Sequence, residues 1–302
     1  MTAMTFAATA HNHASTDNAF NPDTQRIKSH LFFLADDLLE GRDTGSRGHE
    51  IAALYIATEF AKYGLKPAGT DGYMQNVAFR KANLVQESPK FTFTQNGETV
   101  DFDYPKEYLA SPSLLSTEAN VKGEMVFVGY GIVADELSHN DYKDLDVKGK
   151  VVVALAGKPS DFPSEEGAHF ASGYQKQKYA VDNGAIGMIT ITTPKNEKVR
   201  PYQSRLNYIH TPRMAWLDDS GQPANSFSQL KGGAYMSEGA ARKLFEGAEK
   251  SLDDVYAQLE ADKVPQGFAL NGVVDISKTS VHDTITSPNV VGVLEGSDPE
   301  LK

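Results

Sequence analysis

Near its C-terminal end the sequence returns to an apolar strand, residues 289–294, after a long middle segment of short strands and helices. Two helices come first, and the second begins at Ser46. The first shows apolar side chains at the three- and four-residue steps of one buried helical face, namely Ile27, Leu31, Leu34 and Leu38. This order of helices, strands, mixed middle and returning strand predicts an α/β domain interrupted by a β-rich insertion.

Local signals place the individual elements. The first helix is predicted to start at Asn21, with Pro22 at its first position, and to stop at Gly41. The pair Asn96-Gly97 between alternating segments predicts a β-hairpin, and Asn271-Gly272 is interpreted as another turn. Further strands are expected at residues 73–79, 123–133, 150–156, 185–192, 214–217 and 234–236, and further helices after Ser237 and Ser251.

We therefore predict three regions. Residues 1–21 are expected to be a disordered tail or a leader remnant and are left out of the fold. Residues 22–120 and 282–302 are assigned to one incomplete α/β domain, to which the returning strand belongs. Residues 121–281 are assigned to the inserted domain.

Composition excludes several classes of function. The chain has 40 acidic and 29 basic residues and a net charge of −11, so neither nucleic acid nor an anionic membrane is expected as a partner. It has no cysteine, which excludes disulfides, thiolate zinc sites, iron–sulfur clusters and a cysteine nucleophile. No stretch approaches the roughly 18 apolar residues of a membrane span.

The N-terminal segments resemble a peptidase family. Residues 30–46 (HLFFLADDLLEGRDTGS), followed by 53–57 (ALYIA), 60–67 (FAKYGLKP) and 72–77 (GYMQNV), are similar to the start of the secreted co-catalytic two-zinc aminopeptidases. That family includes bacterial leucine aminopeptidases, aminopeptidase Y and the glutamate carboxypeptidases. The resemblance implies an α/β zinc-peptidase domain and an extracytoplasmic location, periplasmic or secreted.

The middle of the chain resembles the protease-associated (PA) domain that is inserted in many of these enzymes. The similar segments are residues 127–132 (FVGYGI), 146–153 (DVKGKVVV) and 180–191 (AVDNGAIGMITI). Residues 287–298 (SPNVVGVLEGSD) then resemble the return to the catalytic domain. The resemblance implies that the PA domain walls one side of the substrate cleft and limits which peptides enter.

The resemblance places the family's catalytic residues after the last residue of this sequence. In the family, a His-x-Asp strand, a bridging Asp, a Glu-Glu doublet, another acidic ligand and a final His follow the returning strand. They hold two zinc ions, which polarise the peptide carbonyl and generate hydroxide, and the first Glu of the doublet is the general base. All of these positions lie beyond Lys302, so no catalytic or metal-binding residue and no cofactor is assigned to this chain.

The chain contains residues that imitate the ligand set. They are His139, Asp141, Glu165, Glu166, Asp182 and His210, in the family's order of ligand types. We interpret them as solvated loop residues, because all fall inside the PA-like segment and lack a strand that would fix them. Asp141, Asp144 and Asp146 are interpreted as an acidic turn rather than a calcium loop, and Ser46 as a helix cap rather than a nucleophile.

Two functions follow as hypotheses. The first is the N-terminal and PA-domain segment of a zinc-dependent aminopeptidase-like peptidase, with a peptide as substrate. The alternative is a non-catalytic module that uses its PA domain to bind protein or peptide. A reading frame that continues past Lys302 into a His-x-Asp strand would favour the first. We also expect the isolated chain to self-associate, because an incomplete sheet leaves apolar strand edges uncovered.

We predict that the 302-residue chain by itself does not hydrolyse aminoacyl substrates, with or without added zinc. Such catalysis needs at least three well-placed ligands per ion, an open coordination position and a positioned general base. Zinc stoichiometry by elemental analysis, measured beside the turnover of a leucine anilide, checks this. Two tightly bound zinc ions and activity that is lost in Glu165→Gln would contradict it.

Overall fold

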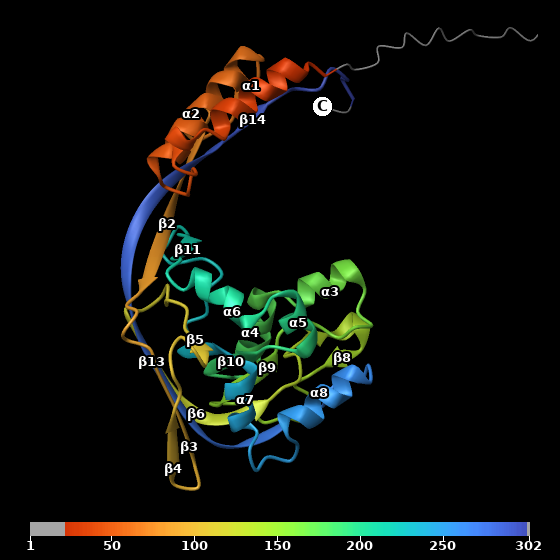
Figure 1. Cartoon of the computed structure of the whole chain (residues 1–302). Coiled ribbons are helices and arrows are strands. Elements are labelled where there is room, and N and C mark those ends of the chain that lie inside the picture. Colours follow the sequence, from red (N-terminus) through yellow and green to blue (C-terminus); the bar gives the residue numbers. More distant parts are fainter. Residues whose placement is uncertain (1–21, 301–302) are drawn as a thin grey trace, which may run out of the picture. The chain divides into compact units, whose positions relative to one another are not determined.

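The computed structural model describes residues 22–300, which divide into two units (Figure 1). The smaller unit combines the residues up to Met74 with those from Val290 onward, and the larger unit contains residues 75–289. Helices and a multi-stranded mixed sheet confirm the predicted α/β class. The tail predicted at residues 1–21 lies outside the described residues. No helix in the described part is long and apolar enough to cross a membrane.

The smaller unit is built from both ends of the chain. It contains α1 (Thr24–Leu34), the 3-10 helix η1 (Asp37–Leu39), α2 (Arg47–Lys62), β1 (Lys66–Pro67) and β14 (Gly292–Val293). Strand β14 pairs antiparallel with β1, with Val293 opposite Lys66. The returning apolar strand therefore lies beside the first helices, where the sequence analysis expects it.

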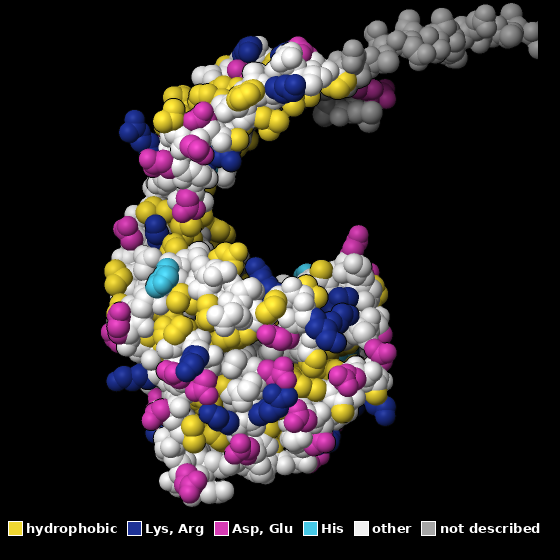
Figure 2. Space-filling model, in the orientation of Figure 1, with side chains coloured by type: hydrophobic (Ala, Val, Ile, Leu, Met, Phe, Trp, Pro, Cys, Tyr) yellow, Lys and Arg dark blue, Asp and Glu magenta, His cyan; other side chains and the backbone are white. Residues whose placement is uncertain are grey.

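Helix α1 differs from its prediction in its start, its end and its burial, and it ends at Leu34 rather than at Gly41. Its N-cap is Asp23, whose Oδ1 accepts hydrogen bonds from the backbone N–H groups of Gln25 (2.9 Å) and Arg26 (3.2 Å), whereas the predicted start, Asn21, lies outside the described residues. The predicted buried face is wrong, since Leu31 is 60% exposed and no residue of α1 is buried. Periodicity identifies an apolar face, but it does not show what covers that face. Figure 2 shows hydrophobic side chains at the surface of this unit.

The larger unit contains a ten-stranded sheet with the path β11-β2-β13-β6-β9-β10-β12-β5. Its centre is four parallel strands, β6 (Glu118–Phe127), β9 (Val151–Leu155), β10 (Gly187–Ile191) and β12 (Gly232–Met236). The antiparallel strands around this centre are β2 (Met74–Leu84), β5 (Tyr108–Leu109), β11 (Arg213–Trp216) and β13 (Phe268–Val290), while β3 (Lys90–Gln95) and β4 (Glu98–Asp101) form a hairpin beside β13. A separate two-stranded sheet joins β7 (Val133–Ala134) and β8 (His139–Asn140).

Helices cover both faces of the parallel centre. Val151, Val153 and Leu155 of β9 pack in a core that includes residues of α7 (Glu238–Leu244) and α8 (Leu252–Glu260). Val152 and Ala154, which point to the opposite face, pack with Ala180 of α4 (Gly173–Asp182). The remaining short helices are η2 (Asp135–Leu137), α3 (Ser164–Phe170), α5 (Pro194–Val199), α6 (Tyr202–Arg205) and η3 (Leu206–Tyr208). Cover on both faces explains the uninterrupted apolar run of β9.

The two Asn-Gly pairs behave differently. Asn96 and Gly97 both have positive φ and connect β3 to β4, which confirms the predicted hairpin. The turn predicted at Asn271-Gly272 is wrong, because β13 continues through it and only its register with β6 shifts. Gly272 has φ +133°, and a Cβ there would collide with the Phe93 ring. The pair forms a bulge that lets β3 approach β13.

The units divide the chain at other residues than the sequence analysis predicted. The predicted boundaries at residues 121 and 282 fall inside β6 and β13, two paired strands of the larger unit. Residues 75–120 join this unit because β2, β3 and β5 belong to its sheet. Its first and last residues lie together, since Asn289 Nδ2 donates a hydrogen bond to Gln75 Oε1 (3.1 Å).

We predict that Ile189→Ala destabilises the larger unit by about 2–5 kcal/mol, because Ile189 of β10 is fully buried and the truncation leaves a cavity. The free energy of unfolding in urea checks this, followed by the fluorescence of Trp216, the only tryptophan. The control is Val199→Ala, at an 82% exposed position, which should change stability by less than about 0.5 kcal/mol. Equal effects of the two variants would contradict the prediction.

Candidate functional site

The structure brings together only one pair from the residues that imitate zinc ligands. His139 on β8 lies 3.1 Å from Asp141, measured from Nε2 to Oδ1, and both side chains are mostly buried. The other carboxylate oxygen of Asp141 accepts a hydrogen bond from the backbone N–H of Ile132 (3.0 Å). The interpretation as solvated loop residues is therefore wrong for this pair, because His139 lies on a strand and both side chains are mostly buried, where they join the β7–β8 turn to Ile132.

The other candidate residues have separate local roles. Glu165 and Glu166 lie in the first turn of α3, where the helix dipole favours negative charge. Asp182 forms an ion pair with Lys178 along α4, and His210 is exposed in a loop. Asp146 pairs with Lys150 at 3.4 Å.

Within residues 22–300, no group of three or more histidine and acidic side chains is arranged to hold a metal ion. The residues described therefore offer no ligand set for the two zinc ions that the family resemblance implies. Ser46 is the N-cap of α2, and its hydroxyl accepts a hydrogen bond from the backbone N–H of His49 (3.2 Å), in agreement with its interpretation as a cap.

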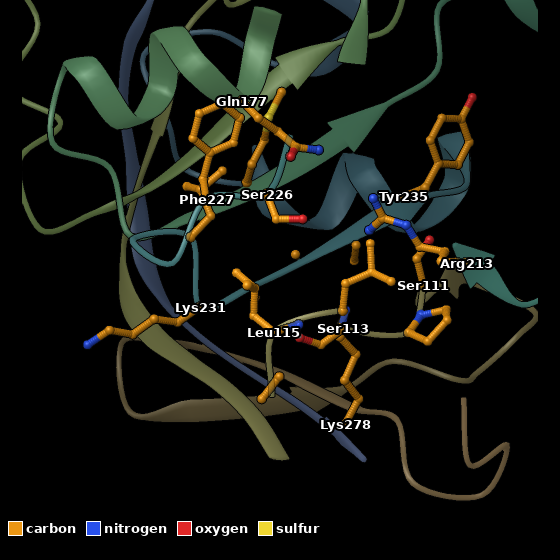
Figure 3. Close-up of a pocket in the computed structure, with 18 of the residues that line it drawn as sticks. Ser111, Ser113, Leu115, Gln177, Arg213, Ser226, Phe227, Lys231, Tyr235 and Lys278 are labelled. Atoms are coloured by element: carbon orange, nitrogen blue, oxygen red, sulfur yellow. Dashed lines mark hydrogen bonds between the residues drawn. The ribbon is translucent and has the colours of Figure 1, made fainter. Parts of the chain in front are cut away.

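A cavity of about 250 Å³ lies in the larger unit, beside β12 and on the α4 side of the sheet (Figure 3). Met188 of β10 and Gly233 of β12 are paired in register, as are Thr190 and Tyr235, and all four line it. Gln177 of α4 also lines it, together with two loops, residues 111–115 and 225–231. The cavity is thus formed where the cover that α4 gives the sheet is replaced by loops.

Two glycines let β12 form this part of the cavity. A Cβ on Gly232 would lie 2.6 Å from Cγ1 of Val121, and one on Gly233 would collide with the carbonyl oxygen of Met188. Any larger residue at either position would push β12 away from its neighbours. The Gly-Gly sequence at the start of β12 is therefore a packing requirement.

The loop of residues 111–115 is fixed to β13. The backbone N–H of Ser113 donates to Oγ of Ser280 (3.0 Å), and Nε2 of His282 donates to the Ser113 carbonyl (2.7 Å). Since Nε2 must carry the proton in that bond, Nδ1 of a neutral His282 is left to accept a hydrogen bond from Arg80 Nη1 at 3.3 Å. Three side chains of two strands thus hold the wall in place.

The charged side chains that line the cavity are all basic. They are Arg213, Lys231 and Lys278, and no Asp or Glu is among the lining residues. This contrasts with the whole chain, whose net charge is −11. Across the part of the chain that is described, no ion pair or side-chain hydrogen bond neutralises Arg213 or Lys278.

Burial and mutual repulsion act on these two cations. Burial, together with the positive charge of Arg213, lowers the pKa of Lys278 to about 8. Arg213 is exposed, although partial burial of its guanidinium lowers the pKa of that group. Two partly desolvated like charges at one cavity raise the free energy of the empty site. A bound anion would lower this free energy by offsetting their repulsion.

The sequence analysis missed both residues, although one pattern points to Lys278. Along β13 the inward positions alternate through Val274 and Ile276, which are buried, and the next position in this phase is Lys278. A lysine in the apolar phase of a strand is an unusual choice and a detectable signal. Arg213 carries no comparable local signal. It comes near Lys278 because β11 and β13 flank β2.

A second cavity of similar size, about 250 Å³, lies where β9 and β10 end. Parallel sheets often bind ligands at this edge. Two of its polar side chains are engaged. Lys158 donates hydrogen bonds to the carbonyls of Phe162 (2.8 Å) and Pro163 (3.1 Å), and Ser160 donates to Asp262 (3.2 Å). The other lysines that line it, Lys195, Lys198 and Lys263, are exposed to solvent. The cavity beside β12 is the stronger candidate for binding because its Lys278 is partly buried and has no partner among the residues described.

Comparisons with known proteins assign the chain to no family. No model of a known protein family matches the chain, and no curated protein sequence matches it. Among solved structures, BSAP, a zinc aminopeptidase from Bacillus subtilis, has 14% identity and a TM-score of 0.33 over 91% of this chain. The psychrophilic subtilisin-like protease Apa1 from the Antarctic psychrotroph Pseudoalteromonas sp. AS-11 has 10% identity and a TM-score of 0.28 over 68%. This chain covers 47% of the first and 36% of the second, and we base no functional argument on either.

We predict that acetylation of Lys278 rises with pH with a midpoint near 8, because only the neutral amine reacts and burial lowers its pKa to about 8. In Arg213→Gln the midpoint should move to higher pH, since removing a nearby positive charge favours the protonated amine. Competitive labelling followed by mass spectrometry measures both midpoints. Arg242→Gln is the control, because Arg213 is the only charged group among residues 22–300 that shifts this pKa. A midpoint that stays fixed in Arg213→Gln would contradict the prediction.

Proposed function

We propose that this chain is the N-terminal and PA-like segment of a zinc-dependent, extracytoplasmic aminopeptidase-like peptidase, and that residues 75–289 contact its peptide substrate. No step of hydrolysis is assigned to the residues described, because they offer no zinc site. The contribution of this chain is instead to bind the peptide and to restrict which peptides reach the reacting centre.

The observation that supports the proposal is the pairing of β1 with β14. It makes the smaller unit discontinuous in sequence, with residues 75–289 inserted between its two parts. The segments that resemble the aminopeptidase domain, residues 30–46, 60–67 and 287–298, fall wholly or mostly in this discontinuous unit. The PA-like segments, residues 127–132, 146–153 and 180–191, fall in the inserted unit. Residues 72–77 cross the boundary between the two units. The discontinuity of the smaller unit supports the proposal of a host domain that carries an insertion.

The second candidate function is a non-catalytic peptide-binding module. It is favoured by the cavity beside β12, since every residue that lines it belongs to the larger unit. A unit that carries a complete cavity can bind a ligand without the smaller unit. The two functions share the binding step and differ only in whether hydrolysis follows.

The experiment that separates them is an activity assay on the product of the complete reading frame that contains this sequence. We expect it to release 4-nitroaniline from leucine 4-nitroanilide, to lose this activity with 1,10-phenanthroline and to regain it with zinc, because metal-assisted hydrolysis depends on the bound ion. The 302-residue chain alone is the inactive control. A complete product that binds peptides but shows no chelator-sensitive turnover would overturn the peptidase proposal and favour the binding module.

A further inference from the structure

We propose that Arg213 and Lys278 form a carboxylate-binding site in the cavity beside β12, and that it takes a carboxylate of a peptide ligand. The inference takes its class of ligand, a peptide, from the proposed function. It goes beyond that function in assigning the residues that bind and the chemical group that they select.

The cavity carries unpaired positive charge. Arg213 and Lys278 line one cavity, and none of the carboxylates described pairs with either (Figure 3). A partly buried cation normally either has a counter-ion or has a lowered pKa. Lys278 has no counter-ion among the residues described, and its pKa is lowered. A single carboxylate would neutralise one charge and screen its repulsion with the other. The planar guanidinium of Arg213 also matches the two oxygens of a carboxylate.

The cavity also offers neutral hydrogen-bond donors. Oγ of Ser113 accepts hydrogen bonds from the backbone N–H groups of Leu115 (3.3 Å) and Ser116 (3.2 Å), so its own proton is left to donate. Ser111 lines the same cavity and adds a second hydroxyl, whereas the hydroxyl of Ser226 already donates to the carbonyl of Ala224 (3.4 Å). A carboxylate has about four acceptor positions, which two cations and a few hydroxyls can satisfy together.

The remaining wall of the cavity suits a peptide. Leu115, Met188, Phe227 and Leu230 add apolar surface to the lining of the cavity. A volume of about 250 Å³ is at the small end of ligand pockets, which suits one amino-acid residue with its carboxylate rather than a nucleotide. Either the terminal carboxylate of a peptide or an Asp or Glu side chain has this combination of charge and apolar surface.

The test measures the binding of three N-terminally labelled peptides to the 302-residue chain by fluorescence anisotropy. The peptides share a neutral leucine-containing sequence. One has a free terminal carboxylate, one has a terminal amide, and one has a terminal amide and a single internal glutamate. We expect one or both of the acidic peptides to bind about tenfold or more tightly than the neutral amide, as for hydrogen bonds to charged groups. The acidic peptide that binds more tightly identifies the source of the carboxylate.

Four variants assign the effect to the site. Arg213→Gln and Lys278→Gln should each bring the acidic peptides close to the affinity of the neutral amide. Lys143→Gln removes the same charge from an exposed lysine of the larger unit that does not line the cavity, so it should keep the preference. Circular dichroism and the urea midpoint show whether each variant is folded, and Arg213→Lys, which keeps the charge, should retain part of the preference.

The outcomes separate this inference from the proposed function. Equal affinity for all three peptides, unchanged in Arg213→Gln and Lys278→Gln, would overturn the carboxylate site and leave peptide binding in place. Displacement of a label from the site by inorganic phosphate, without any preference for acidic peptides, would also overturn it. Failure of all three peptides to bind would overturn it as well, while the peptidase proposal would still be decided by the chelator-sensitive turnover of the complete product.

Discussion

Strand β9 is buried at all five of its positions, and this burial on both faces determines how the larger unit is built. A strand without an exposed face needs apolar cover on each side of the sheet. Helices α7 and α8 contribute on one side, and α4 contributes on the other. The cover by α4 does not continue to β12 without interruption, and two loops complete that side. The candidate cavity is therefore a consequence of how a doubly covered sheet ends near its edge.

Two lysines of the larger unit illustrate what makes a buried cation informative. The pKa of Lys176 and that of Lys278 are both lowered to about 8, in each case chiefly by burial. Lys176 donates hydrogen bonds to the carbonyls of Leu155 (2.8 Å) and Gly157 (2.6 Å) and lies 5.6 Å from the centre of the Tyr130 ring. It joins α4 to the end of β9 and needs no ligand. Lys278 has no such partners, and the difference in partners, rather than the pKa, marks it as a binding residue.

Local chemistry decided which parts of the structure could be predicted from the sequence. The hairpin at Asn96-Gly97 and the helix caps Ser46 and Ser251 depend on neighbours a few residues away, and they were found. The turn at Asn271-Gly272 failed because its conformation depends on the packing of Phe93 from another strand. Likewise, Arg213 and Lys278 meet only through the order of β11, β2 and β13 in the sheet, which no spacing in the sequence reveals.

The hydrogen bond between Gln75 and Asn289 has a consequence for the history of the chain. The larger unit begins and ends at adjacent points. The smaller unit therefore loses little entropy in bringing its two parts together, whatever the length of the larger unit. Ancestral genes could gain, lose or exchange such a segment while keeping the pairing of β1 with β14. Selection could then alter the cavity and the strands around it independently of the helices that precede them.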